Sequence, residues 1–506
     1  MARIVVIGAG MGAMAAAARL AVAGHRVTVF ERGETYGGSV GRFERDGFVF
    51  DTGPGLLHLP AVWRDLFVKT GKEPLESRVE LVQVDPASRH LFADGTDVAL
   101  PNASRAGVVA ALDAALGAGS GERWGEFLVR ARDAWDRSRR PLLEEPLPAD
   151  PSRFGRDPYP AVKGGLLRRP ARTLAEVGRR ELRDARLAAL LESHALAYGF
   201  DPATVPASAA VLPYMEQTFG SWYVRGGIRA LADAVHERCL ARRVEFVFGA
   251  EVTDVRIKDG RAVGVELADG RSVEADHVVA GSPVPALYRD HVLGWDSRED
   301  WPRYQESVRT GRVTVCLALR GAREDGAAHR TVVHSTDRAD ELAALGAGRL
   351  CERPTVVVLR PGDERLLPDG GHEAVTVTAT VPAGDSSSSE NLWGEGAAGA
   401  MGAQAFADRM LEAAAAAVPG LRERLLWREV RTPVDTFRET GAHQVPGPAL
   451  AGAHGELLPA ANSSPVPGLY FAGGWSHPGG GLAHSGMSGA LVAGLVVEGA
   501  DFRGSQ

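Results

Sequence analysis

The sequence predicts an α/β fold, and three features near its start support that class. Residues 4–7 are an apolar run, Ile-Val-Val-Ile, which is typical of a buried parallel strand. Residues 8–13 read Gly-Ala-Gly-Met-Gly-Ala and open a stretch of small residues suited to a helix. Residues 27–31 form a second apolar run that ends in Glu31. Strand, glycine turn, helix and a strand ending in an acid are the elements of a Rossmann-like dinucleotide site.

Each position of this motif has a physical role. Gly8 permits a tight turn, Gly10 lets a pyrophosphate approach the backbone, and Ala13 is small enough for the helix to pack on the strand. The free N–H groups and partial positive charge of the helix N-terminus favour phosphate. Glu31, 23 residues after Gly8, is placed to accept hydrogen bonds from a ribose diol. It would repel a 2′-phosphate, which argues against NADP.

Further motifs lie at both ends of the chain. Residues 46–54, after Gly37 and Gly38, read Asp-Gly-Phe-Val-Phe-Asp-Thr-Gly-Pro. Residues 468–481 read Gly-Leu-Tyr-Phe-Ala-Gly-Gly-Trp-Ser-His-Pro-Gly-Gly-Gly, and residues 485–489 read Ser-Gly-Met-Ser-Gly. In these motifs the chain resembles the FAD-dependent phytoene desaturase family of amine-oxidase-like flavoproteins. The resemblance covers most of the chain, and most firmly residues 1–60, 220–283 and 466–498.

The resemblance implies FAD as cofactor and a Rossmann-like FAD-binding domain of the GR2 type with an inserted α+β substrate domain. The FAD-binding domain is then discontinuous and comprises residues 1–75, 220–284 and 430–506. The substrate-binding domain comprises residues 76–219 and 285–429. Within it, the Pro-rich stretch 141–160 and the Gly/Ser-rich stretch 382–401 are expected to be loops.

The resemblance also implies which residues bind FAD. The expected set is Gly8, Gly10, Met11, Gly12, Ala13, Glu31, Arg32, Gly38, Ser39, Gly53, Pro54, Val252, Gly281, Gly473, Gly474, Gly486 and Met487. The helix after Gly486 is expected to direct its N-terminus, with the Met487 N–H, at the flavin ring. At Ser39 the family usually has Arg, so the charge is absent there, and Arg42 is a candidate replacement.

Candidates for the reaction itself come from the same motifs. Trp475 and His477 are expected beside the flavin, with His477 as a candidate for proton transfer. The residues His58, Trp222, Tyr223 and His484 are further candidates to frame an apolar substrate. No metal site is expected, because the chain has neither a CxxC motif nor a Cys/His cluster.

The rest of the chain alternates between strand and helix patterns. The turn residues 93–96, Ala-Asp-Gly-Thr, predict a hairpin, and the glycines 226 and 227 precede a helix. Expected helices are 61–70, most of 104–198, 228–240 and 403–418. Expected strands are 79–84, 89–92, 98–100, 244–248, 252–258, 260–267, 270–273, 275–281, 313–319, 331–334, 355–359 and 374–381.

Composition narrows the class of protein. The 506 residues are 45% hydrophobic and 24% charged with a net charge of −7, so a globular protein with a large core is expected and a nucleic-acid partner is not. The widely separated Cys239, Cys316 and Cys351 indicate reduced thiols. No leader precedes the first strand and no apolar run reaches about 18 residues, so we expect a cytoplasmic protein. The sequence does not specify an oligomeric state.

Residues 161–190 carry eight Lys/Arg against three Asp/Glu, with leucines interspersed. The favoured interpretation is a helix whose basic face lies in solvent. The alternative is peripheral contact with a negatively charged membrane surface.

These features predict an FAD-dependent oxidoreductase that acts on an apolar polyene or isoprenoid, by carbon–carbon desaturation with hydride transfer to flavin N5. Amine oxidases of the superfamily commonly place a lysine near N5 from the later part of the chain. The last of the four lysines here is Lys258, so amine oxidation is disfavoured.

Two alternatives remain open at this point. One is a polyene-processing flavoenzyme of secondary metabolism that carries out reductive cyclisation, as for polycyclic tetramate macrolactams, or double-bond isomerisation. The other is a non-catalytic lipid-escort protein, because GDP-dissociation inhibitors share the fold without the flavin. The retained glycines and Glu31 argue against the second alternative.

Overall fold

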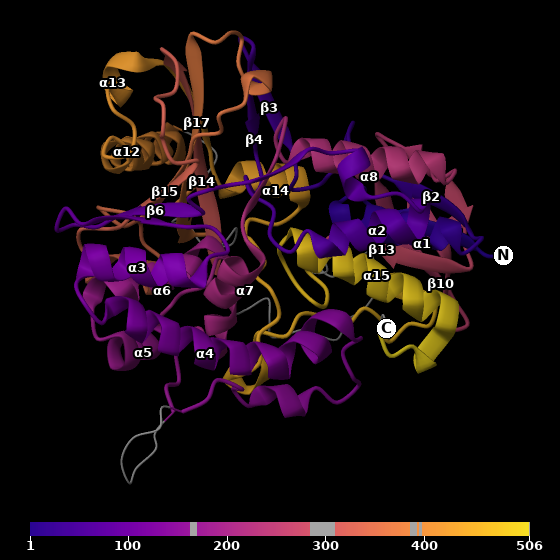
Figure 1. Cartoon of the computed structure of the whole chain (residues 1–506). Helices are drawn as coiled ribbons and strands as arrows, with labels where there is room; N and C mark the ends of the chain where they lie inside the picture. The colour runs from indigo at the N-terminus through magenta and orange to yellow at the C-terminus, as the bar shows by residue number, and fades with distance from the viewer. Residues whose placement is uncertain (162–169, 284–308, 385–391, 394–396, 505–506) are drawn as a thin grey trace.

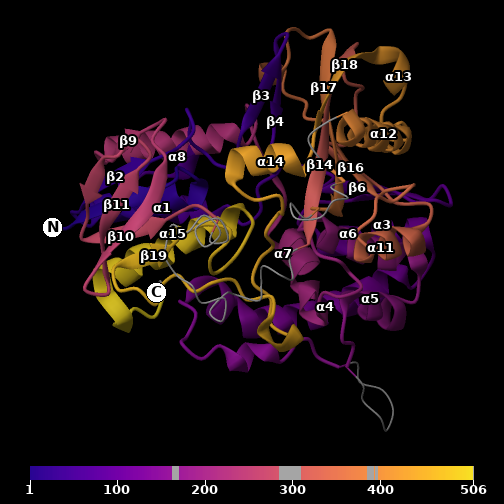
Figure 2. The same ribbon diagram turned by 180° about the vertical axis from the view of Figure 1, so that it is seen from behind.

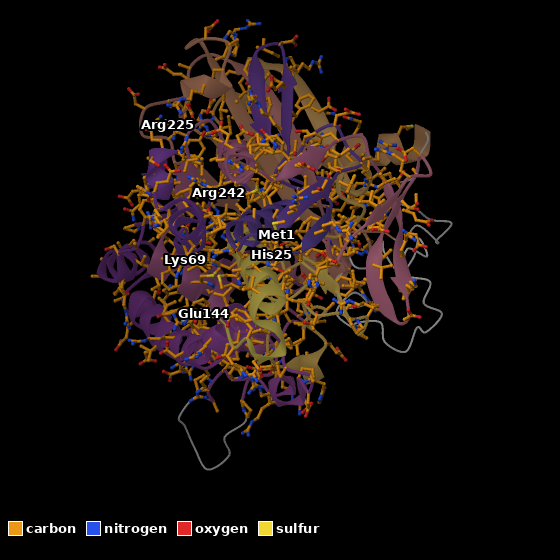
Figure 3. The ribbon with its side chains drawn as sticks, turned by 90° about the vertical axis from the view of Figure 1, so that its right-hand side faces the viewer. Met1, His25, Lys69, Glu144, Arg225 and Arg242 are labelled. Carbon is orange, nitrogen blue, oxygen red and sulfur yellow. The ribbon has the colours of Figure 1, made fainter. Side chains whose placement is uncertain are left out.

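The computed structural model describes residues 1–161, 170–283, 309–384, 392–393 and 397–504. Two sheets lie side by side, and a layer of helices covers one end of the molecule (Figure 1). Both termini lie on the side of the smaller of these two sheets. Viewed from that side, Met1 lies close to His25, whose Nδ1 accepts a hydrogen bond from the Ala2 N–H (Figure 3).

The first sheet is five-stranded and entirely parallel, as expected for a Rossmann-like domain. Its order is β19 (Leu469–Phe471), β13 (His277–Ala280), β1 (Arg3–Ile7), β2 (Arg26–Phe30) and β9 (Glu245–Val247). Its strands come from the beginning, the middle and the end of the chain. One face packs on α1 (Met11–Val22), α2 (Ala61–Gly71), α8 (Arg229–Ala241) and α15 (Leu482–Glu498). The meander β10 (Val252–Lys258), β11 (Arg261–Leu267) and β12 (Ser272–Glu274) covers the other face.

Small residues bring the two ends of the chain into contact. A Cβ on Gly12, in α1, would lie 2.6 Å from the Gly473 Cα, and a Cβ on Gly489, in α15, would lie 2.5 Å from the Gly12 carbonyl oxygen. Neither distance leaves room for a side chain. Helices α1 and α15 can pack backbone to backbone only because these positions are glycine.

The second sheet has seven strands and forms the larger part of the molecule. Its order is β18 (Leu425–Arg431), β14 (Thr310–Arg320), β17 (His372–Pro382), β16 (Val356–Leu359), β15 (Arg330–Val333), β6 (Ser88–Leu91) and β7 (Asp97–Leu100). Helices α12 (Ala397–Ala414) and α13 (Leu421–Arg424) cover its outer face. Its inner face points toward the first sheet, and α14 (Pro433–Thr440) lies between the two sheets in both views (Figure 2).

Shorter elements complete the fold. The helical layer consists of α3 (Arg105–Leu116), α4 (Ser120–Arg139), α5 (Leu174–Val177), α6 (Ala185–Ala197) and α7 (Val211–Phe219). Two small antiparallel pairs join the layers: the hairpin of β3 (Arg42–Arg45) with β4 (Phe48–Asp51), and β5 (Leu81–Gln83) with the distant β8 (Trp222–Val224). Helix α11 (Arg338–Gly346) follows β15.

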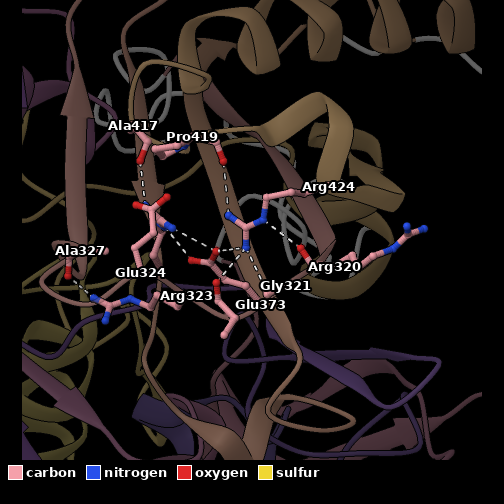
Figure 4. A network of polar contacts seen from close by, with 11 residues as sticks. Arg320, Gly321, Arg323, Glu324, Ala327, Glu373, Ala417, Pro419 and Arg424 are labelled. Atoms are coloured by element: carbon pink, nitrogen blue, oxygen red, sulfur yellow. Dashed lines mark hydrogen bonds and ion pairs between the residues drawn. The ribbon is translucent and has the colours of Figure 1, made fainter.

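A buried network of charges anchors the outer end of the seven-stranded sheet (Figure 4). Glu373, on β17, accepts hydrogen bonds from Arg360 at 2.6 and 3.0 Å and from Arg424 at 2.8 Å. Arg360 also donates to the Ala417 carbonyl at 3.0 Å, and Arg424 donates to backbone carbonyls near the end of β14. Glu324 lies 3.8 Å from Arg360, so the two arginines face two carboxylates and the charges balance where they are buried.

Both of the expected loops, 141–160 and 382–401, contain helical residues. The stretch 141–160 contains two short helical turns, Arg140–Glu144 and Ser152–Gly155. In the stretch 382–401, α12 begins at Ala397 instead of residue 403, because an alanine-rich run favours helix at that point. Residues 385–391 and 394–396 of that stretch lie outside the described residues.

The basic segment 161–190 is described from residue 170 onward. Its leucines and valine that the structure describes belong to the core of the helical layer: Leu174, Val177, Leu182, Leu187 and Leu190. Arg179 and Arg180 are exposed and contact Glu176. These apolar side chains are therefore used for packing, and contact with a membrane surface stays a prediction. Among the helices of the described ranges, none is both long and apolar enough to cross a lipid bilayer.

Candidate active site

One cavity of about 490 Å³ joins the two halves of the molecule. Its lining combines residues of β1, α1 and α15 with residues of α6, α7, β14 and β17. The volume is in the range of enclosed ligand sites, which are usually apolar with a few convergent polar groups. The first and last motifs of the sequence therefore meet in the same cavity.

The turn between β1 and α1 forms a cradle of bare backbone. Gly8 has φ +85°, which glycine adopts without strain. A Cβ placed on Gly10 would meet no protein atom within 4 Å, so the space above this residue is open to the cavity. Gly38 faces it, since a Cβ there would lie 3.1 Å from the Gly10 Cα. The first N–H groups of α1 have no partner within the helix and are available to an anion.

Glu31 lies at the end of β2 and is held in place by backbone donors. Its Oε2 accepts from the Ala9 N–H at 2.7 Å and its Oε1 accepts from the Gly33 N–H at 2.8 Å. The carboxylate lines the cavity and keeps further lone pairs for a ligand. This is the arrangement that a ribose diol requires.

Most of the residues expected at the cofactor line this cavity. They are Gly8, Gly10, Met11, Gly12, Glu31, Arg32, Gly38, Ser39, Gly53, Pro54, Val252, Gly281, Gly473 and Gly474. Ala13 lies behind the lining, where a Cβ on Gly281 would come within 2.5 Å of the Ala13 Cβ, so it serves the packing of α1 against the end of β13. Arg42 contacts Glu44 instead of the cavity and does not replace the charge missing at Ser39.

The start of the last helix differs from expectation. Helix α15 begins at Leu482, with Gly481 as its N-cap, and not after Gly486. The N–H groups free of intrahelical partners therefore belong to Leu482, Ala483 and His484, all of which line the cavity. Met487 lies one turn further along, so its N–H is used within the helix. Gly486 packs against α2, where its Cβ would lie 2.9 Å from a Val62 methyl carbon.

The aromatic and histidine candidates separate into two groups. Trp475, His58 and His484 line the cavity. His477 is fully buried outside the lining, and its Nε2–H donates to the Glu145 carbonyl at 2.9 Å. Burial lowers the pKa of His477 to about 4, so the ring is neutral. In this position it connects the closing motif to the residue that follows the helical turn Arg140–Glu144.

Trp222 and Tyr223 also lie outside the lining. The Trp222 indole N–H donates to the Phe219 carbonyl, and the Tyr223 hydroxyl donates to Asp363 at 2.9 Å. Both side chains are satisfied within the protein.

The half of the cavity distant from the glycine cradle is bounded by helix α6, helix α7 and the inner face of the large sheet. Its apolar lining residues are Leu56, Leu59, Leu196, Met215, Val357 and Leu359. Tyr198, at the end of α6, connects the halves, because a Cβ on Gly481 would lie 3.7 Å from its ring.

A buried ion pair lies in the same half, and no sequence motif predicts it. Arg330 donates to Glu216 at 2.6 Å, and the imidazoles of His58 and His194 lie 4.0 and 3.9 Å from the other carboxylate oxygen. Burial alone would raise the pKa of Glu216, but Arg330 and the two histidines lower it to about 2. The carboxylate is therefore ionised at neutral pH.

Comparison with known proteins identifies the family. A model of flavin-containing amine oxidoreductases matches residues 14–306. The chain belongs to this family. It is 31% identical over 382 residues to a phytoene dehydrogenase from Streptomyces griseus, covering 73% of this chain and 71% of that protein. It is 27% identical over 504 residues to a 4,4′-diapolycopene oxygenase from Methylomonas sp, covering 98% of each.

A solved structure confirms the fold class. An oxidoreductase from Methanosarcina mazei superposes with a TM-score of 0.66 at 18% identity, covering 97% of this chain and 99% of that one. The protein is thus a phytoene desaturase-like, flavin-dependent oxidoreductase with a Rossmann-like α/β domain.

Proposed function

We propose that the protein binds FAD and desaturates a carbon–carbon bond of a polyene or isoprenoid, with hydride transfer to flavin N5. The observation that carries this proposal is the single cavity, which connects a dinucleotide cradle to an apolar compartment. The relatives that match the chain are named for carotenoid substrates, which agrees with an apolar chain in that compartment.

The residues of the cavity fit FAD. Gly10 leaves open the space that a pyrophosphate needs, Glu31 offers acceptors for the ribose, and the N-terminus of α15 directs its dipole at the region between them and the apolar half. When bound, FAD would supply the hydride acceptor. The protein's part is to hold the substrate against it, and the apolar lining does this by excluding water and restricting the chain's orientation.

His58 is a candidate proton acceptor for the carbon skeleton. It lines the cavity, and its Nε2 lies 4.0 Å from a Glu216 carboxylate oxygen. Burial lowers the pKa of His58, and Glu216 opposes that shift, so the imidazole is neutral and able to accept a proton. The ionised Glu216 beside it would stabilise the resulting imidazolium. Trp475 remains a candidate to flank the ring, and proton transfer by His477 is not favoured by its position.

The test is to purify the protein with its native cofactor and to mix it anaerobically with phytoene. We expect loss of the oxidised-flavin absorbance and a product lighter by two hydrogens. A product of unchanged mass but altered geometry would indicate isomerisation, and an added pair of hydrogens would indicate reduction. A colourless protein that carries lipid would revive the escort alternative. Putrescine serves as the amine control and should leave the flavin oxidised.

A further inference from the structure

The inner face of the large sheet lines the cavity with polar side chains, although a hydrocarbon substrate would need only apolar contacts there. In the register of β14 and β17, Arg312 pairs with Thr380 and Thr314 pairs with Thr378. All four of these residues line the cavity. Arg312 donates to the Ala197 carbonyl at 2.6 Å, which fixes its guanidinium beside α6. This hydrogen bond leaves other N–H groups of the guanidinium available to a ligand.

Arg312 differs from the buried arginines of the protein. Each of the buried ones contacts a carboxylate: Arg229 with Asp233, Arg238 with Glu73, Arg330 with Glu216, and Arg360 with Glu373. Within the part of the chain that the structure describes, Arg312 contacts no carboxylate. Its side chain is half-buried in the cavity wall, and this burial lowers its pKa. A desolvated cation without a counter-charge is costly, so an anion that entered the cavity would be bound strongly.

Two hydroxyl groups next to Arg312 are also free to bind a ligand. Thr314 and Thr378 face each other across β14 and β17. Neither hydroxyl has a hydrogen-bond partner among the residues described here. The neighbouring Thr380 differs, because its hydroxyl donates to the Leu196 carbonyl at 2.6 Å. Arg431, the register partner of Thr314 on β18, also lines the cavity, but it is paired with Glu439. Arg312, Thr314 and Thr378, which we call the polar wall, thus present one cation without a carboxylate partner in the described residues and two hydroxyls to the same space.

We propose that the polar wall binds an oxygen anion at one end of the substrate, a carboxylate or an enolate. The substrate is then an amphipathic polyene, with its chain along the apolar residues of α6, α7 and β16 and its charged end at Arg312. This inference rests on the proposed function and specifies its substrate class. A pure hydrocarbon would leave the guanidinium and both hydroxyls unsatisfied in a cavity from which it had displaced water. The polar wall therefore favours a polyene with an acidic end, as in the polyene-processing alternative, over a carotene hydrocarbon as the natural substrate.

The experiment compares two probes that differ only in charge: all-trans-retinoic acid and its methyl ester. Binding to the flavin-loaded protein is followed by quenching of its tryptophan fluorescence. We expect the wild-type protein to bind the acid at least tenfold more tightly than the ester. Arg312→Gln should reduce this ratio to less than about twofold, and Arg312→Lys should restore part of it.

Matched variants separate recognition from structure. Thr314→Val and Thr378→Val remove free hydroxyls and should each lower the acid-to-ester ratio by about threefold. Thr380→Val, whose hydroxyl is already bonded to the backbone, should leave the ratio unchanged. Equal affinity of the wild-type protein for acid and ester, failure to bind either probe, or a ratio that survives Arg312→Gln would each overturn the proposal. So would loss of flavin from Arg312→Gln with no change in the ratio, because Arg312 would then contact the cofactor.

The outcomes also separate this inference from the proposed function. A protein that dehydrogenates phytoene but shows no preference for the acid keeps the proposed function and loses the polar-wall assignment. A protein that prefers the acid through Arg312, yet whose flavin is reduced by no polyene, keeps the assignment and loses the proposed desaturation.

Discussion

The two halves of the cavity are built by different means. The nucleotide half is mainly backbone: glycines that leave space, N–H groups at helix ends, and one carboxylate held by two backbone donors. The substrate half is mainly side chains, contributed by strands and helices far apart in the sequence. Under the proposed function, the first half would determine which cofactor binds and the second half would select the substrate. Substitutions in one half of the cavity test whether the properties of the other half are affected.

The largest expected effect is on the nucleotide half. Gly10→Val should abolish flavin binding, since its branched side chain would fill the space of the pyrophosphate. The same side chain meets no protein atom near its Cβ, so the protein should fold normally. The measurement is the ratio of flavin absorbance to protein absorbance after purification, together with the circular dichroism spectrum. A yellow Gly10→Val protein would contradict the placement of the cofactor.

Gly12→Val is the matched control for this prediction. A Cβ there would lie 2.8 Å from the Ser485 carbonyl oxygen, so the substitution should prevent α1 from packing on α15. We expect it to yield unfolded or insoluble protein. Folded but colourless protein from Gly10→Val, beside failure of Gly12→Val, would show that neighbouring glycines serve the ligand and the fold separately.

The nucleotide half could largely be predicted from the sequence, because its chemistry is contained in short local motifs. Gly8, Gly10 and Glu31 lie within one strand–turn–helix–strand unit, and each is placed at the cavity as expected. The predicted start of α15 was wrong by several residues. Gly481 caps the helix through its backbone conformation, and the repeated glycines and serines on both sides gave no local sign of which one would do so.

The substrate half could not be predicted in this way. Glu216 and Arg330 are 114 residues apart, and only the packing of α7 against β15 brings them together. Thr314 and Thr378 become neighbours through the register of two strands. His477 shows a second limit of local motifs: it lies within the closing motif but outside the cavity lining, because a motif does not specify where each side chain points.

The next largest effect distinguishes the two arginines of the substrate half. Arg330→Met should destabilise the protein by about 3–5 kcal/mol, because Glu216 would be left buried without its cation. Arg312→Met should cause no loss of stability, because it removes a desolvated charge that lacks a carboxylate. Urea unfolding of both variants measures the difference. Equal destabilisation would mean that Arg312 also has a structural counter-charge and would weaken the polar-wall assignment.

The same ion pair predicts a dependence on acid. The pKa of Glu216 is lowered from 4.5 to about 2 in the folded protein, so its stabilising contribution is complete above pH 4.5 and is lost as the pH falls toward 2. The contribution is at most about 3 kcal/mol. Unfolding of the wild-type protein between pH 7 and pH 3 should therefore be compared with that of the double variant Glu216→Gln, Arg330→Met. If both lose stability equally over that interval, the pair is not the acid-sensitive element.

The smallest effect returns to the nucleotide half. Glu31→Ala should weaken flavin binding by about 1–3 kcal/mol, since it removes the acceptors for the ribose and the acceptor of the Ala9 N–H but leaves the space above Gly10 open. Glu34→Ala makes the same charge change in the same loop at an exposed side chain and should leave the affinity unchanged. Titration of the flavin-free proteins with FAD and with FMN sharpens the result. FMN lacks the adenosine ribose, so its weaker binding should be insensitive to Glu31→Ala. An equal loss of affinity for both nucleotides would place the Glu31 carboxylate away from that ribose.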